Sequence, residues 1–229
     1  MAEVMAGSPV ATAAPEVRRQ FMGRVYGHLV GGVAAFVAAQ YVLFTTGLAG
    51  AIYEVVIATN WLLILGGFMV VSWLATHLAR QARTTASAYG AYGLLVLANA
   101  LLFAAPLYQA EAFAPGAIST AAWLSVGAFV GLSAIALVTG KDFSFLRGIL
   151  LWGGLVALLA IVAAVLFGVA LGTWFSVAMI AFAGAAILYD TQRVYRSFPP
   201  QAVVLAAMHL FSSLALLFWY VLRLVMQRR

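Results

Sequence analysis

Apolar residues run along the chain in seven long blocks, and most of the charged residues lie between these blocks. A helix needs about 20 apolar residues to cross the hydrocarbon layer of a membrane. The blocks do not alternate apolar and polar residues with a period of two, so membrane-spanning strands are excluded. The sequence therefore predicts an all-α, polytopic bundle with seven transmembrane helices, at residues 21–44, 60–79, 87–107, 118–140, 145–167, 173–192 and 202–225.

The composition favours one membrane domain over a soluble fold. Hydrophobic residues make up 66% of the chain and charged residues 8%, whereas ordinary globular domains are about 45–50% apolar. Residues 1–20 lack the basic and then apolar pattern of a cleaved signal. We expect them to form a disordered tail ahead of a membrane domain at residues 21–229. The chain has no cysteine, which excludes disulfides and thiolate metal sites.

Basic residues are distributed unevenly among the predicted loops. The N-terminal region has three, the second, fourth and sixth loops have two each, and the first, third and fifth loops have none. Loops rich in Lys and Arg stay in the cytoplasm, so we expect a cytoplasmic N-terminus. The C-terminus disagrees, because Arg223, Arg228 and Arg229 lie outside if the seventh segment spans fully. A full span is our prediction, and a re-entrant segment is the alternative.

The same distribution bears on partners and location. The net charge of +6 comes from short clusters at segment ends, so it is an orientation signal rather than a nucleic-acid footprint. The absence of a targeting segment and of a long C-terminal tail favours a bacterial inner membrane. Two glycine ladders, Gly23-Gly27-Gly31 and Gly127-Gly131, are typical of close helix packing in lipid. That packing would lie within one chain or form a homodimer face, and we expect a monomer or a weak oligomer.

Asp190 is the main candidate functional residue, because it follows an apolar run at membrane depth. A carboxylate there is costly and is by default part of a functional site. Asp190 lies nine residues before Pro199, and His209 lies nine residues after Pro200. With a rise of about 1.5 Å per residue, both lie roughly 13 Å from the turn between their helices. Ser213 lies one turn deeper, on the His209 face.

Two interpretations of Asp190 stay open. In the first, proton uptake by Asp190, tuned by His209, changes helix packing between about pH 5 and 8, the range that histidine serves. Asp190 would then also be a weak calcium ligand. In the second, Asp190 forms a structural ion pair with Arg193, Arg80 or Arg83, and His209 bonds a carbonyl.

Residues suited to catalysis or to a bound cofactor are scarce. His28 and His77 have no carboxylate at metal-ligand spacing. The only lysine, Lys141, lies in a loop, which excludes an intramembrane Schiff base. We expect no enzyme activity and no cofactor beyond transiently bound calcium.

Four stretches, taken in order, resemble the Bax inhibitor family, the seven-helix proteins with the transmembrane Bax inhibitor motif. The third stretch is the strongest, since it matches the family signature in helix six. The four are RVYGHL at residues 24–29, TGKDFSFL at 139–146, ILYDTQ at 187–192, and LFSSL followed by FWYVLR within 210–223.

The resemblance implies a bundle with the seventh helix central. Family members are described as pH-sensitive calcium leak pathways, as regulators of stress or cell death, and in bacteria as modulators of a membrane-bound ATP-dependent protease. Asp190 resembles the first acid of the family's di-aspartyl pH sensor. The second acid would stand at or near Ser213, where this chain has serine, so the two-carboxylate mechanism is in doubt. Arg80 or Arg83 resembles the arginine that latches the aspartate in some members.

The sequence thus predicts a membrane protein that gives a pH-modulated cation leak, with calcium the expected ion and Asp190 the gate. The alternative is a non-conducting protein that binds and modulates a membrane-bound ATP-dependent protease or a stress response.

Overall fold

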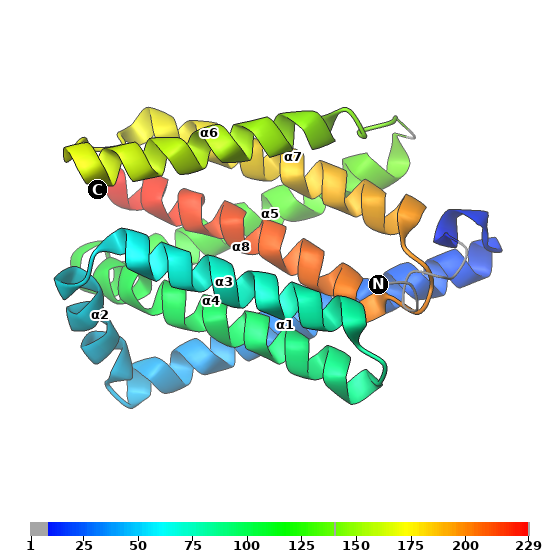
Figure 1. The fold of residues 1–229 in the computed structure, drawn as a ribbon, viewed down its shortest axis with the longest axis horizontal. Helices are drawn as coiled ribbons and strands as arrows, with labels where there is room; N and C mark the ends of the chain where they lie inside the picture. The colour runs from blue at the N-terminus through cyan, green and yellow to red at the C-terminus, as the bar shows by residue number, and fades with distance from the viewer. Residues whose placement is uncertain (1–8, 140, 229) are drawn as a thin grey trace. The chain divides into compact units, whose positions relative to one another are not determined.

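The computed structural model describes residues 9–139 and 141–228, and within them the chain is helical and has no strand (Figure 1). Seven of these helices are long and apolar enough to cross a membrane. The predicted all-α, multi-pass class is confirmed. The described elements are η1 (Val10–Thr12), α1 (Pro15–Thr45), α2 (Leu48–Ala58), α3 (Trp61–Gln81), α4 (Thr85–Phe113), α5 (Ala117–Val138), α6 (Leu146–Phe167), α7 (Thr173–Ser197) and α8 (Val203–Gln227).

The first helix begins earlier than the predicted residue 21. Pro15 occupies the first turn and Glu16 follows it, and both residue types are favourable at a helix N-terminus. Before it, Val10 is fully buried, and its N–H donates to the Phe198 carbonyl at 2.9 Å. Of the disordered tail expected at residues 1–20, residues 1–8 fall outside the described residues, whereas residues 15–20 belong to α1. Gly140, the end of the fourth predicted segment, and Arg229 also fall outside the described residues.

The short helix α2 was predicted as a loop, and that prediction was wrong. Its 11 residues span about 16 Å at 1.5 Å per residue, roughly half the thickness of a hydrocarbon layer. A criterion based on spanning length cannot detect such a helix. Gly47, whose backbone is in the left-handed conformation, lies directly before α2. After α2, Asn60 caps the next helix, α3, by accepting the Leu62 N–H at 2.9 Å.

Three glycines make the turns in the loops that carry no basic residue. Gly47, Gly116 and Gly168 have φ values of 76°, 78° and 67°, a conformation that glycine adopts without steric cost. Gly47 and Gly116 lie directly before α2 and α5, and Gly168 lies directly after α6. Each therefore fixes where an apolar helix starts or stops.

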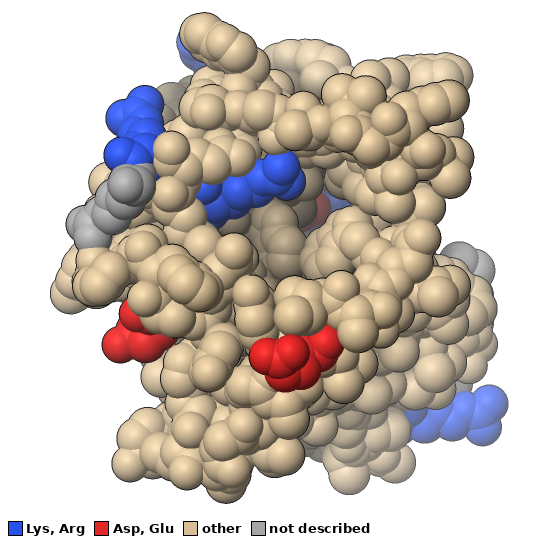
Figure 2. All heavy atoms as spheres, turned by 90° about the vertical axis from the view of Figure 1, so that its left-hand side faces the viewer, with Lys and Arg blue, Asp and Glu red and all other residues tan. Residues whose placement is uncertain are grey.

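The chain forms two compact units. Unit 1 consists of Met1–Ala105 with Arg193–Phe211, and unit 2 consists of Pro106–Gln192 with Ser212–Arg229. The helices α4, α7 and α8 each contribute residues to both units. Figure 2 shows that charged side chains are few on the face that it displays, in keeping with a chain of which 8% is charged.

Aromatic side chains of α1, α4 and α8 form much of the core of unit 1. The Phe36 ring lies edge-on to Phe103 at 5.4 Å and to Phe211 at 6.4 Å between centroids. Tyr92 lies so close to α1 that a Cβ added at Gly32 would come within 1.9 Å of its hydroxyl oxygen. Glycine at position 32 therefore makes the close contact between α1 and α4 possible.

In unit 2, α6 is the most exposed of the spanning helices. Its most apolar stretch contains no buried residue, although Gly153 lies close to the Phe182 ring of α7, at 3.2 Å from an added Cβ. At the other end of this unit, the rings of Phe175 and Tyr220 meet edge-on at 6.0 Å. Lipid is thus expected to cover most of α6.

The two glycine ladders are not packing sites within their units. A Cβ added at any of these five glycines would meet no atom of the same unit within 4 Å. Within the described part of each unit, the expectation of close helix contact at the ladders is therefore wrong. The close contacts involve other glycines, namely Gly32 in unit 1 and Gly153 and Gly184 in unit 2.

Candidate functional site at the end of α7

Three consecutive residues near the end of α7 connect this helix to three other elements of unit 2. The Asp190 carboxylate accepts a hydrogen bond from the Ser213 hydroxyl of α8. The Thr191 hydroxyl pairs with the Ser133 hydroxyl of α5 at 3.3 Å. The Gln192 side chain bonds the loop between α5 and α6. This stretch lies inside the ILYDTQ signature. The motif therefore links α7 to α8, to α5 and to the loop between α5 and α6.

The pair formed by Asp190 and Ser213 is partly shielded from solvent. Asp190 is half-buried, Ser213 is 5% exposed, and Ile187, one turn before Asp190, is fully buried. A hydrogen bond to an ionised carboxylate is about twice as strong as one between neutral groups. The bond between α7 and α8 therefore depends on the protonation state of one carboxyl group.

Gln192 holds the loop that follows α5. Its Oε1 accepts the Phe143 N–H at 2.7 Å, and its Nε2 donates to the Lys141 carbonyl. Within the same loop, the Asp142 carboxylate accepts the Ser144 N–H at 2.9 Å. Because Gln192 is only 5% exposed, these bonds are shielded from water and fix the loop to α7.

Gln192 belongs to the ILYDTQ signature, but the sequence did not predict it as a site residue. The available signal was that Asp190, Thr191 and Gln192 are polar residues in succession at the end of an apolar segment. Such a run also occurs where a helix simply emerges from the membrane. Only the structure shows that all three side chains point toward protein partners.

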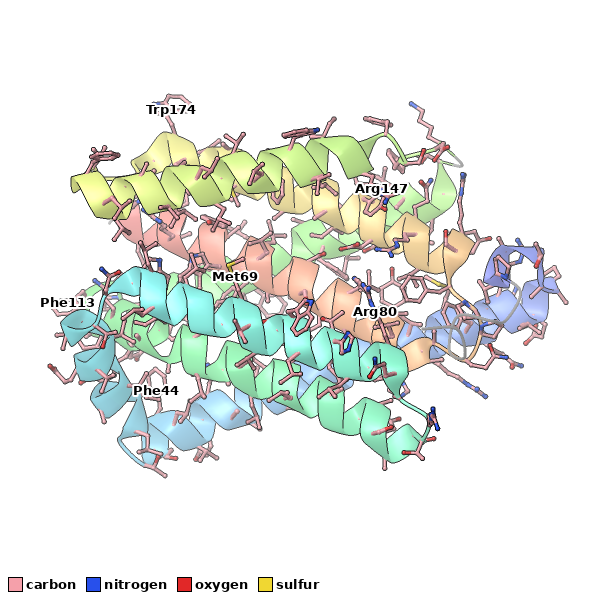
Figure 3. The ribbon with its side chains drawn as sticks, in the orientation of Figure 1. Phe44, Met69, Arg80, Phe113, Arg147 and Trp174 are labelled. Carbon is pink, nitrogen blue, oxygen red and sulfur yellow. The ribbon has the colours of Figure 1, made fainter. Side chains whose placement is uncertain are left out.

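His209 and the three latch candidates belong to unit 1. The His209 ring lies edge-on to Phe198 at 5.7 Å, and the Arg193 guanidinium carbon lies 5.8 Å from the centroid of that same ring. Arg80 is half-buried in the last turn of α3 (Figure 3). Arg83 is exposed and lines a cavity of about 400 Å³ with Thr84 and Gln201. Their pairing with Asp190 stays a prediction.

Among the residues that the structure describes, no group of three or more His, Cys, Asp or Glu side chains is arranged to hold a metal ion. The pair at Asp190 provides one carboxylate and one hydroxyl. Calcium takes six to eight oxygen ligands, so Asp190 could be only part of a transient site. Both ring nitrogens of His28 take part in hydrogen bonds instead. Its Nδ1 lies 2.7 Å from the Arg24 carbonyl and its Nε2 lies 2.5 Å from the Tyr89 hydroxyl.

A comparison with known proteins supports the family resemblance of the ILYDTQ motif. No curated protein matches the chain. The family model described as "Inhibitor of apoptosis-promoting Bax1" matches residues 18–229, which include the whole of the site at the end of α7. With seven helices long and apolar enough to span a bilayer, the chain belongs to the Bax inhibitor family of multi-pass membrane proteins.

Proposed function

We propose that this protein is a non-enzymatic membrane protein that gives a slow, pH-modulated path for cations, with calcium the expected ion. Asp190 is the proposed gate. The observation that supports this proposal best is the hydrogen bond from Ser213 to Asp190, because it joins two spanning helices through one ionisable group. Arg80, Arg83 or Arg193 is the proposed latch for the carboxylate, and His209 tunes its response.

The proposed gate works through the strength of one helix–helix contact. Ionised Asp190 accepts a charge-assisted bond from Ser213, which holds α7 against α8. Protonation removes the charge and weakens the bond. The contact between α7 and α8 then loosens, so cation flux is expected to rise as the pH falls.

A flux assay in liposomes tests the proposal. The purified protein is reconstituted, and calcium entry is measured with a trapped indicator at several values between about pH 5 and 8. We expect the wild-type flux to depend on pH. Asp190→Asn is expected to abolish that dependence, because the amide cannot change its charge in this range.

The matched control is Glu54→Gln, which removes an exposed carboxylate of α2 and leaves the pair at Asp190 intact. Its pH profile should equal that of the wild type. Ser213→Ala should give a higher flux at neutral pH, since the hydroxyl donor is lost. No flux from folded wild-type protein at any of these values would contradict the proposed leak.

The second candidate is a non-conducting protein that modulates a membrane-bound ATP-dependent protease or a stress response. Ser213 favours it, because a single carboxylate with a hydroxyl partner is a weak ligand for a divalent cation. Under this alternative, the pair at Asp190 would set the shape of a surface that a partner contacts. Absence of flux in the liposome assay would select this candidate.

A further inference from the structure

The basic residues at the end of α8 are not explained by the proposed gate. If α8 spans the membrane, Arg223 lies at the end opposite to the basic loops, where the positive-inside rule predicts few cations. Arg223 is not simply a solvated charge there. It is half-buried and lines a cavity of about 380 Å³ in unit 2.

The cavity lies between the ends of two spanning helices. Trp219, Arg223 and Met226 line it from α8, and Gln109 lines it from the last turns of α4. Gln227, at the end of α8, adds a further polar side chain to the lining of the cavity. None of the residues that line this cavity is acidic, so its chemistry suits an anion bound by a guanidinium and by amide N–H groups.

The Arg223 side chain is held in place before any ligand arrives. Its Nη2 donates to the Leu171 carbonyl at 2.9 Å. A guanidinium has five N–H donors in a fixed fork, and this bond uses one of them. A positioned guanidinium loses little conformational entropy when it binds, which favours tight binding of a phosphate.

We propose that this cavity binds the phosphate of a phospholipid headgroup. The cavity lies at the ends of α4 and α8, the level at which headgroups lie when helices of this length span a bilayer. Its volume is in the range of small-molecule sites, which is about 300–1,000 Å³. Trp219 and Met226 give it an apolar part against which the glycerol and the first acyl carbons pack.

A lipid titration of the full-length chain tests this site. Delipidated protein in detergent is titrated with dioctanoyl phosphatidylglycerol, and the bound fraction is read by native mass spectrometry. We expect one lipid to bind per chain. Arg223→Gln should weaken the binding on the order of tenfold, the usual effect of losing a hydrogen bond between charged groups.

Three controls make the outcome decisive. Arg228→Gln removes a charge that does not line the cavity, and it should bind as the wild type does. Gln109→Leu leaves Arg223 and its bond to Leu171 unchanged and should also weaken binding, which covers the case in which Arg223→Gln fails to fold. Dioctanoylglycerol, which has the same chains and no phosphate, should not bind.

The proposal is overturned if Arg223→Gln and Gln109→Leu bind the lipid as the wild type does. Equal weakening by Arg228→Gln would also overturn it, because the effect would then be one of net charge alone. Displacement of the lipid by inorganic phosphate at equal concentration would show that the site takes free phosphate and not a headgroup.

Discussion

In the proposed gate, only the Asp190 carboxyl titrates, because its partner Ser213 is neutral. Two carboxylates at this place would share a proton and would titrate as a coupled pair. Here the partner of the carboxylate is a neutral hydroxyl, which donates a hydrogen bond to it. The response of this chain at the pair is therefore expected to follow the titration of one group.

Gly32 lies where α1 comes close to the Tyr92 side chain of α4. Gly32→Ala would place a methyl group 1.9 Å from the Tyr92 hydroxyl oxygen. We expect the free energy of unfolding in detergent to fall by about 1–3 kcal/mol, the usual effect of overpacking. Denaturant titration followed by circular dichroism measures it.

The control for Gly32→Ala is its neighbour. Gly31→Ala adds the same methyl group where no atom lies within 4 Å, so its unfolding free energy should equal that of the wild type or exceed it by up to about 1 kcal/mol, because alanine favours a helix more than glycine does. Equal losses in the two variants would show that helix backbone effects, and not contact with Tyr92, decide the outcome.

At the scale of elements, Gln192 should govern how often the loop after α5 opens. Lys141 is the only lysine of the chain, so a lysine-specific protease cuts only there. That cut requires release of the Lys141 carbonyl, which accepts from Gln192. Gln192→Leu keeps the volume of the side chain and removes both bonds, and we expect cleavage on the order of tenfold faster.

Gln201→Leu is the matched control, because Gln201 is an exposed glutamine between α7 and α8. Its cleavage time course should follow that of the wild type. If Gln192→Leu is cleaved no faster than Gln201→Leu, the loop is held by other contacts.

The spanning elements could be predicted from the sequence because their signal is local and long. Every block of about 20 apolar residues became a helix. The helix α2 could not be predicted in this way, since an 11-residue apolar run fits a loop, a strand or a helix equally well.

The site could be predicted in part. Counting residues from Pro199 and Pro200 put His209 at the level of Asp190, but the structure brings Ser213, one turn deeper, to Asp190. The partners of Gln192 could not be predicted, because they are backbone groups of Lys141 and Phe143, about 50 residues away in sequence, and backbone groups carry no residue-specific signal. The expectation of close helix contact at the glycine ladders was wrong for a related reason. The spacing of small residues predicts which face of a helix can pack closely, but not what packs against that face.

At the scale of the whole molecule, the distribution of basic residues makes a prediction about topology. The chain has no cysteine, so single cysteines can be introduced and labelled on intact cells with an impermeant maleimide. We expect Glu54→Cys to be labelled and Ser144→Cys to be labelled only after lysis, because the loops with Lys and Arg face the cytoplasm.

Arg228→Cys decides the side of the C-terminus in the same assay. A full span of α8 predicts labelling on intact cells together with Glu54→Cys. Labelling only after lysis would show that the last segment returns to the cytoplasmic side.

The exposure of α6 has a mechanical consequence. Its 22 residues measure about 33 Å along the axis, slightly more than the roughly 30 Å of a typical hydrocarbon layer. In a thinner bilayer such a helix tilts, so that its apolar length fits within the hydrocarbon layer. Because α6 follows directly on the loop that Gln192 binds, this tilt would pull on the end of α7. The thickness of the bilayer would then act on the helix end that carries Asp190.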